Sequence, residues 1–304
     1  MRAHGGARRR QARGRPAPDR YRPARRREDL GRGAGPAQGS APALLPARPW
    51  KVATDSRVTR RLIVNADDFG LTPGVSAGIL SAHRHGIVSS TTLLATAPVD
   101  AEHLAALRDC GLGVGIHVNL TLGRPLSGAR SLVDIDGRFV RDPGHAAARA
   151  NARDVEREVS AQLEKFAVLM RREPTHLDTH HHVGLLAPVT EVVLDAARRL
   201  GVAVRSQNET ARARALTAGL RTPDHFFGES GPGAYWSLAR TLAHLRALPA
   251  GVSEFMAHPG WCDDALAYSR YGRQRETEMI GLGTAAARAA VSSLGIRLSH
   301  FGEL

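Results

Sequence analysis

The chain has 304 residues, 42% of them hydrophobic, which is enough for one large domain of barrel size or for two ordinary domains. Its formal net charge of +13 is concentrated at one end: residues 1–60 hold 16 Lys and Arg against 4 Asp and Glu, whereas residues 61–304 hold 26 against 25. Apolar runs of about 18 residues are absent from the sequence, so we expect no membrane span, and two cysteines without CxxC spacing exclude a disulfide framework and a thiolate zinc site.

Residues 1–58 are rich in Arg, Pro and Gly and hold few large apolar residues to offset the entropy of ordering. We therefore expect a disordered extension, followed by a single folded domain over residues 59–304. An Arg-rich arm is also typical of nucleic-acid binding or of a transit peptide. No secretory apolar segment follows the arginines, because Ala41 to Leu45 is only five residues long and is closed by Pro46. An extension with no folded role is an equally good interpretation.

The folded region begins with Arg61–Gly70, RLIVNADDFG. The apolar run that starts at Leu62 is typical of a strand buried on both faces, and it ends in two adjacent carboxylates, Asp67 and Asp68. In parallel α/β folds the loops at the carboxyl ends of the strands form the active-site face, so these acids are predicted to lie where chemistry occurs. Taken alone, the stretch is equally typical of a turn.

Strand and helix patterns alternate along the rest of the chain. A helix is predicted to begin after Thr72, with Pro73 in its first turn, and to stop at Gly86. Further strands are predicted at 88–95, 114–118, 202–205, 252–257 and 296–300, and further helices at 100–109, 155–170, 190–200, 235–248 and 272–294. Residues 127–144 read as an excursion over the active-site face, and the structure of 208–233 is not readable from its pattern. About seven strands alternating with helices favour an α/β fold with a parallel, barrel-like sheet.

A second strong signal lies at 174–186, PTHLDTHHHVGLL. Five potential metal or proton ligands fall within seven residues: His176, Asp178, His180, His181 and His182. If this stretch is extended, alternation puts Asp178, His180 and His182 on one face and Thr179 and His181 on the other. A purification tag or a metal-scavenging tract has a similar histidine density, but such tracts lie in low-complexity tails. This run lies in mid-chain between two predicted helices.

These polar residues all follow predicted strands, so one face of a barrel can collect them. The acid pair ends the first strand, His117 lies near the end of a later one, and His258 follows the strand at 252–257. A lone histidine such as His117 is more often structural than a ligand. One carboxylate and two imidazoles form a facial triad that suits Zn²⁺, Fe²⁺ or another divalent cation. A second carboxylate can then take a proton from water while an acid protonates a departing amine.

Four motifs in this order, NADDFG, GIHVNLT, THLDTHHHV and MAHPGW, resemble the YdjC/ChbG (ChbG/HpnK) family of carbohydrate deacetylases, over roughly Arg61 to Leu304. The resemblance implies an irregular, TIM-like (β/α) barrel related to polysaccharide deacetylases. It also implies that the protein removes N-acetyl groups from sugars such as chitobiose with one divalent metal ion, Mg²⁺ or Zn²⁺.

Position by position, the resemblance implies that Asp68, His117 and His180 are the metal ligands. Asp67 would then be the base, and His258 an acid or oxyanion partner.

Two further residues are expected to contact substrate. His182 shares a strand face with His180, and Arg205 ends its own strand, although a surface salt bridge is an equally good interpretation of Arg205. The chain has Gly184 where the family usually has a further histidine, which affects the expected substrate contacts more than the metal.

Three alternatives stay open. A metal-dependent phosphoesterase also uses Asp and His ligands, but the sequence has no Gly-rich phosphate cradle. The second alternative is a non-enzymatic nucleic-acid binder acting through the basic arm, and the third is a metal-holding relative without hydrolytic activity. For the leading hypothesis we expect a cytoplasmic protein with a small carbohydrate as its partner, no membrane and no nucleic acid, and a homodimer is left open.

Overall fold

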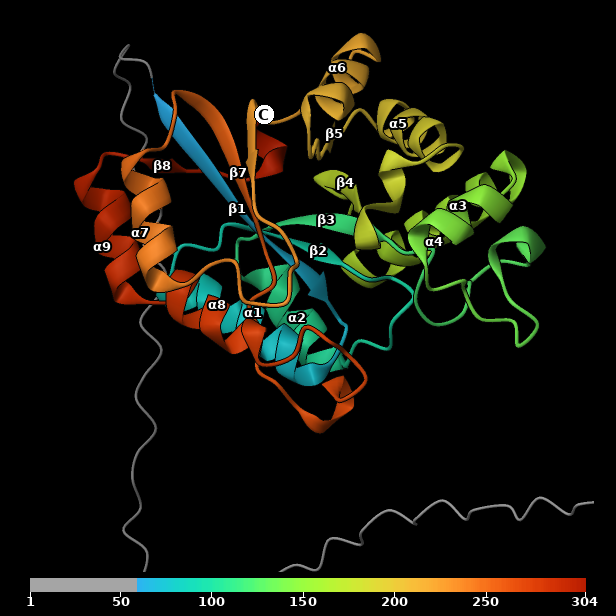
Figure 1. Ribbon diagram of the computed structural model, residues 1–304, viewed down its shortest axis with the longest axis horizontal. Coiled ribbons are helices and arrows are strands. Elements are labelled where there is room, and N and C mark those ends of the chain that lie inside the picture. Colours follow the sequence, from blue (N-terminus) through green and yellow to red (C-terminus); the bar gives the residue numbers. More distant parts are fainter. Residues whose placement is uncertain (1–58) are drawn as a thin grey trace, which may run out of the picture. The chain divides into compact units, whose positions relative to one another are not determined.

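The computed structural model describes residues 59–304, and the extension predicted for residues 1–58 lies outside this part (Figure 1). The strands are β1 (Arg60–Phe69), β2 (Ser90–Leu93), β3 (Gly113–Val118), β4 (His176–Thr179), β5 (Ala203–Val204), β6 (His225–Phe227), β7 (Gly251–Ala257) and β8 (Arg297–Leu298). The helices are α1 (Pro73–His85), α2 (Ala101–Asp109), α3 (Pro143–Arg149), α4 (Ala152–Met170), α5 (Val189–Leu200), α6 (Glu209–Thr217), α7 (Leu238–Arg246), α8 (Gln274–Leu282) and α9 (Ala285–Ser293). Among these described helices, none is both long and apolar enough to cross a membrane.

The strands form one parallel sheet in the order β5-β4-β3-β2-β1-β7-β6, with β8 beside β1. Because β7 pairs with β1 over Arg60 to Ala66, β8 shares the opposite edge of β1 with β2. Within residues 59–304 no pairing joins the end strands β5 and β6, so the barrel stays open there. The helices lie around the outside of the strands (Figure 1). The predicted α/β fold with an irregular parallel barrel of about seven strands is confirmed.

Strand β1 separates the outer core from the inside of the barrel. Leu62 and Val64 are fully buried in the main core under the helices, whereas Ile63 belongs to a smaller cluster with Ala203 and Phe301. Alternation therefore directs the odd-numbered residues of β1 inward. Phe301 packs with Ile63 and Ala203 in this inner cluster, nearer to the amino ends of β1 and β5 than to their carboxyl ends.

Helix α1 follows the predicted signals closely. The Thr72 hydroxyl accepts a hydrogen bond from Val75 N (3.2 Å), Pro73 is the first helical residue, and Gly86 follows the last turn.

The single helix predicted for 272–294 is wrong, because α8 ends before Gly283 and α9 begins after it. Ile87 N donates to Leu282 O (2.9 Å), so the end of α1 occupies a carbonyl that a continuous helix would use.

Candidate metal centre and active-site cleft

A cleft of about 1040 Å³ lies at the carboxyl ends of the strands. Six of the seven predicted site residues line it: Asp67, Asp68, His117, His180, His182 and His258. The end of the predicted excursion over residues 127–144, from Arg141 to Pro143, also borders the cleft, as expected. The tertiary structure thus gathers residues from β1, β3, the turn after β4 and the loop after β7 at one place.

Asp67 and Asp68 both face the cleft although they are consecutive in a strand, where side chains normally alternate. The register between β1 and β2 shifts between Ala66 and Phe69, and Asp68 has a left-handed backbone with φ 72°. This bulge re-aims the side chain of Asp68. Aspartate tolerates the left-handed region better than most residues, so the cost is modest.

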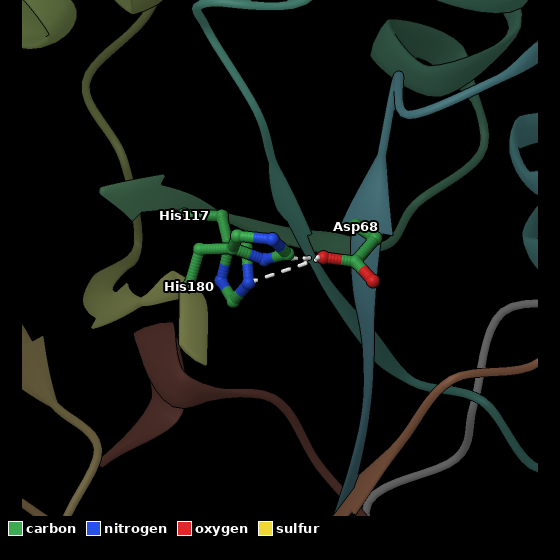
Figure 2. A group of neighbouring side chains, drawn as sticks. All are labelled: Asp68, His117 and His180. Carbon is green, nitrogen blue, oxygen red and sulfur yellow. Dashed lines mark ion pairs between the residues drawn. The ribbon is translucent and has the colours of Figure 1, made fainter. Parts of the chain in front are cut away.

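The predicted ligands Asp68, His117 and His180 converge (Figure 2). Asp68 Oδ1 lies 3.0 Å from His180 Nδ1 and 3.3 Å from His117 Nε2. One ligand atom from each residue lies within 4.8 Å of the others, and all three residues are buried. Asp68 Oδ1 accepts no hydrogen bond within residues 59–304. A buried carboxylate oxygen without a donor, facing two imidazole nitrogens, fits a divalent cation.

His117 is oriented from behind by Asp178, its register partner on β4. Its Nδ1 lies 2.6 Å from Asp178 Oδ1, which leaves Nε2 directed at Asp68. A carboxylate behind a ligating imidazole is typical of metal sites, because it fixes the ring. Burial lowers the pKa of His117, but Asp178 and the other nearby carboxylates outweigh burial and raise it to about 10.

Arg205 lies beneath the cleft, with its side chain fully buried. Its guanidinium donates to both carboxylate oxygens of Asp67 (2.6 and 2.7 Å) and to Glu254 Oε1 (2.6 Å), and it lies 2.7 Å from Asp178 Oδ2. Arg205 does not line the cleft, so the expected substrate contact is wrong, and the surface-salt-bridge interpretation is wrong as well. Arg205 instead holds the Asp67 carboxylate in place by donating to both of its oxygens. Burial raises the pKa of Asp67, but Arg205 outweighs burial and holds this pKa well below its usual range.

His258 lies on the wall of the cleft next to Asp67. Its Nε2 is 3.9 Å from Asp67 Oδ2 and 3.4 Å from Ser230 Oγ, and its backbone N donates to Glu278 Oε2 (2.6 Å). Burial lowers the pKa of His258, whereas Asp67 and Asp68 raise it. The effect of burial is larger, so the imidazole is neutral near pH 7.

The histidine run does not alternate as an extended strand would. Strand β4 ends at Thr179, and His181 and His182 adopt left-handed backbone conformations with φ 54° in a 3₁₀ turn. As a result His181 lines the cleft together with His180 and His182, and the prediction that it faces away is wrong. His182 lies in the cleft as expected, with its Nδ1 3.3 Å from Gln207 Nε2.

Residues 61–292 match the family model described as YdjC-like protein. The chain belongs to the YdjC-like family. A carbohydrate deacetylase from Geobacillus stearothermophilus is 39% identical over 248 residues, which cover 80% of this chain and 98% of that protein. A chitooligosaccharide deacetylase from Enterobacter sp. (strain 638) is 36% identical over 259 residues, again 80% and 98% of the two chains. The crystal structure of a provisionally named cellobiose-phosphate cleavage protein from Enterococcus faecalis V583 has a TM-score of 0.72 at 31% identity, covering 81% of this chain and 98% of that one.

In this YdjC-like chain, sequence reasoning missed the charged residues that surround the predicted ones. Arg275 of α8 donates to Asp68 Oδ2 (2.7 Å), and Glu278, three residues further on, accepts from the backbone N of His258. Glu254 of β7 contacts Arg205. The spacing of Arg275 and Glu278 places them on one helix face, but nothing in the sequence shows that this face is buried.

Gly184 lies outside the lining of the cleft. Its backbone N donates to Thr179 Oγ1 (2.9 Å), and a Cβ at this position would approach Thr179 Cγ2 to 2.7 Å. A histidine at this position would require Thr179 to move. Gly184 thus bears on the cleft through Thr179, which is part of the lining, and not through the triad.

Proposed function

We propose that this protein is a divalent-cation-dependent deacetylase that hydrolyses the N-acetyl group of an amino sugar or a chitooligosaccharide. The observation that carries the proposal is the buried triad of Asp68, His117 and His180 in the cleft, where Asp68 Oδ1 has no hydrogen-bond donor among residues 59–304. The relatives named carbohydrate and chitooligosaccharide deacetylases support the reaction and the substrate class, because the alignments with them cover nearly their whole length.

The donor set favours Zn²⁺ over Mg²⁺. Mg²⁺ prefers oxygen ligands in an octahedral arrangement, whereas one carboxylate with two imidazoles is a common zinc donor set. When bound, such a cation lowers the pKa of its water and polarises the acetyl carbonyl.

The chain's own residues supply the proton transfers. Asp67 stays ionised because of Arg205, so it can accept the proton of the attacking water as the new C–O bond forms. Its Oδ2 lies 3.9 Å from His258 Nε2, on the wall of the same cleft. We assign to His258 the relay of that proton: the neutral imidazole accepts it from Asp67 and delivers it to the sugar nitrogen as the C–N bond breaks, which releases acetate and a free amine.

The test compares acetate release from N-acetylated chitooligosaccharides by the wild-type protein and by Asp68→Asn and His180→Ala. Both substitutions remove a cation ligand, and we expect acetate release to fall to background together with the zinc content of the purified protein. His145→Ala is the matched control, because that side chain is 83% exposed and lies outside the cleft lining. Unchanged turnover in either ligand variant would refute the proposal, and phosphate release from a phosphate ester in its place would favour the phosphoesterase.

A further inference from the structure

We propose that Arg275 is a positioning residue for the cation site, which holds the Asp68 carboxylate so that its Oδ1 faces His117 and His180. The inference rests on the proposed function, because it assumes that the triad binds a cation. It concerns a residue of α8, which lies outside the four motifs that carry the family resemblance.

The two oxygens of Asp68 have separate partners. Arg275 Nη2 donates to Oδ2 (2.7 Å), whereas both imidazole nitrogens face Oδ1. The side chains of Asp68 and Arg275 are each only 3% exposed. Since Oδ2 is taken by the guanidinium, Oδ1 is the oxygen left for a cation.

Asp68 has no other restraint of this kind. Across residues 59–304 its side chain accepts one hydrogen bond, and Arg275 is the donor. The bulge at the end of β1 turns the backbone toward the cleft, but it does not fix the rotation of the carboxylate. A charge-assisted hydrogen bond from a buried guanidinium does so.

Arg275 is itself fixed by the elements around it. Its Nε donates to Tyr271 O (3.0 Å), in the segment before α8. Three residues along the same helix face, Glu278 accepts hydrogen bonds from His258 N (2.6 Å) and from the Tyr271 hydroxyl (2.5 Å). One face of α8 thus holds both the ligand Asp68 and the loop that carries His258.

The guanidinium has two opposite effects on cation binding. Its positive charge repels a cation, so that effect alone predicts tighter binding when Arg275 is removed. Its hold on Asp68 favours binding, and loss of partners that orient metal ligands typically costs about 10–100-fold in metal affinity. We infer that positioning outweighs repulsion, because the carboxylate is short, buried and otherwise unrestrained.

The experiment measures Zn²⁺ affinity by calorimetry on the full chain after chelator treatment, for the wild type, Arg275→Met and Arg275→Lys. We expect the dissociation constant to rise about 10–100-fold in Arg275→Met and by less in Arg275→Lys, which keeps the charge but loses the planar fork. Arg273→Met is the control, because Arg273 precedes the same helix and is exposed. Excess Zn²⁺ should restore acetate release in Arg275→Met, which a purely structural defect would not allow.

The outcomes separate the two proposals. A wild-type protein that binds no Zn²⁺ overturns the cation site and this inference together. A wild type that binds Zn²⁺ while Arg275→Met binds it equally well or more tightly overturns the role of Arg275 alone. If Arg275→Met fails to fold, as judged by circular dichroism, Arg275→Lys decides, and affinity equal to that of the wild type contradicts the inference.

Discussion

More carboxylates than guanidiniums are buried around the cleft. Five carboxylates and two guanidiniums are buried around it: Asp67, Asp68, Asp178, Glu254, Glu278, Arg205 and Arg275. An excess of buried negative charge is costly, and the proposed divalent cation at the triad would offset it. The same excess of carboxylates raises the pKa of His117 above its ordinary value.

The Glu254 side chain leads to a prediction about how the stability of the fold depends on pH. Burial raises its pKa from 4.5 to about 7, although the nearby charge of Arg205 acts to lower it. Its Oε2 has no hydrogen-bond partner within residues 59–304. Between pH 4.5 and about pH 7, Glu254 keeps its proton in the folded chain but releases it in the unfolded chain. Glu254 therefore makes the folded state less stable as the pH rises through this range. Glu254→Gln removes this titration, while its amide oxygen can still accept from Arg205.

We therefore expect the free energy of unfolding of Glu254→Gln to decrease less between pH 5 and pH 7.5 than that of the wild type, in urea titrations of both proteins. The same pH dependence in the two proteins would contradict a raised pKa for Glu254.

At the scale of elements, α1 packs closely against the loop after β7, which carries His258. A Cβ on Gly78 would lie 2.5 Å from Gly260 Cα, so the helix and the loop touch through backbone atoms. Gly-to-Ala substitutions inside helices normally stabilise by about 1 kcal/mol. Here we expect Gly78→Ala to destabilise by about 1–3 kcal/mol, because the added methyl group overpacks the contact.

Chemical unfolding measures the sign of this change, and acetate release should fall as well, since Gly260 is two residues from His258. Ser81→Ala, in the same helix, is the control. A more stable Gly78→Ala protein would contradict the prediction, because it would show that the loop moves aside without loss of stability.

For the whole molecule, the cleft joins segments that are distant in the chain, and a cation bound there should link them. Ligands that bind only the folded state stabilise it by about 2.7 kcal/mol at a hundredfold excess over the dissociation constant. We expect added Zn²⁺ to raise the melting temperature of the wild type and excess EDTA to reverse the rise. Asp68→Asn should show no shift in differential scanning fluorimetry, and an equal shift in that variant would place the stabilising cation elsewhere. The cytoplasmic location and the homodimer stay predictions.

The sequence by itself determined the alternation of strands and helices, the acids that end the first strand and the histidines that become potential ligands. Those features depend on local periodicity and on residue type, which hold wherever the segment lies. Thr72, Pro73 and Gly86 bound α1 as their capping properties dictate.

Only the tertiary structure decided how these residues act. Arg205 and Asp67 are 138 positions apart in the chain, and Arg275 and Asp68 are 207 apart, so no local pattern could show that the guanidiniums clamp those carboxylates. The bulge that turns Asp68, the turn that brings His181 into the cleft and the break at Gly283 likewise depend on contacts with neighbouring segments. The physical reason is that burial and pairing of charge depend on which segments meet in space, whereas periodicity along the chain records only which face of an element is apolar.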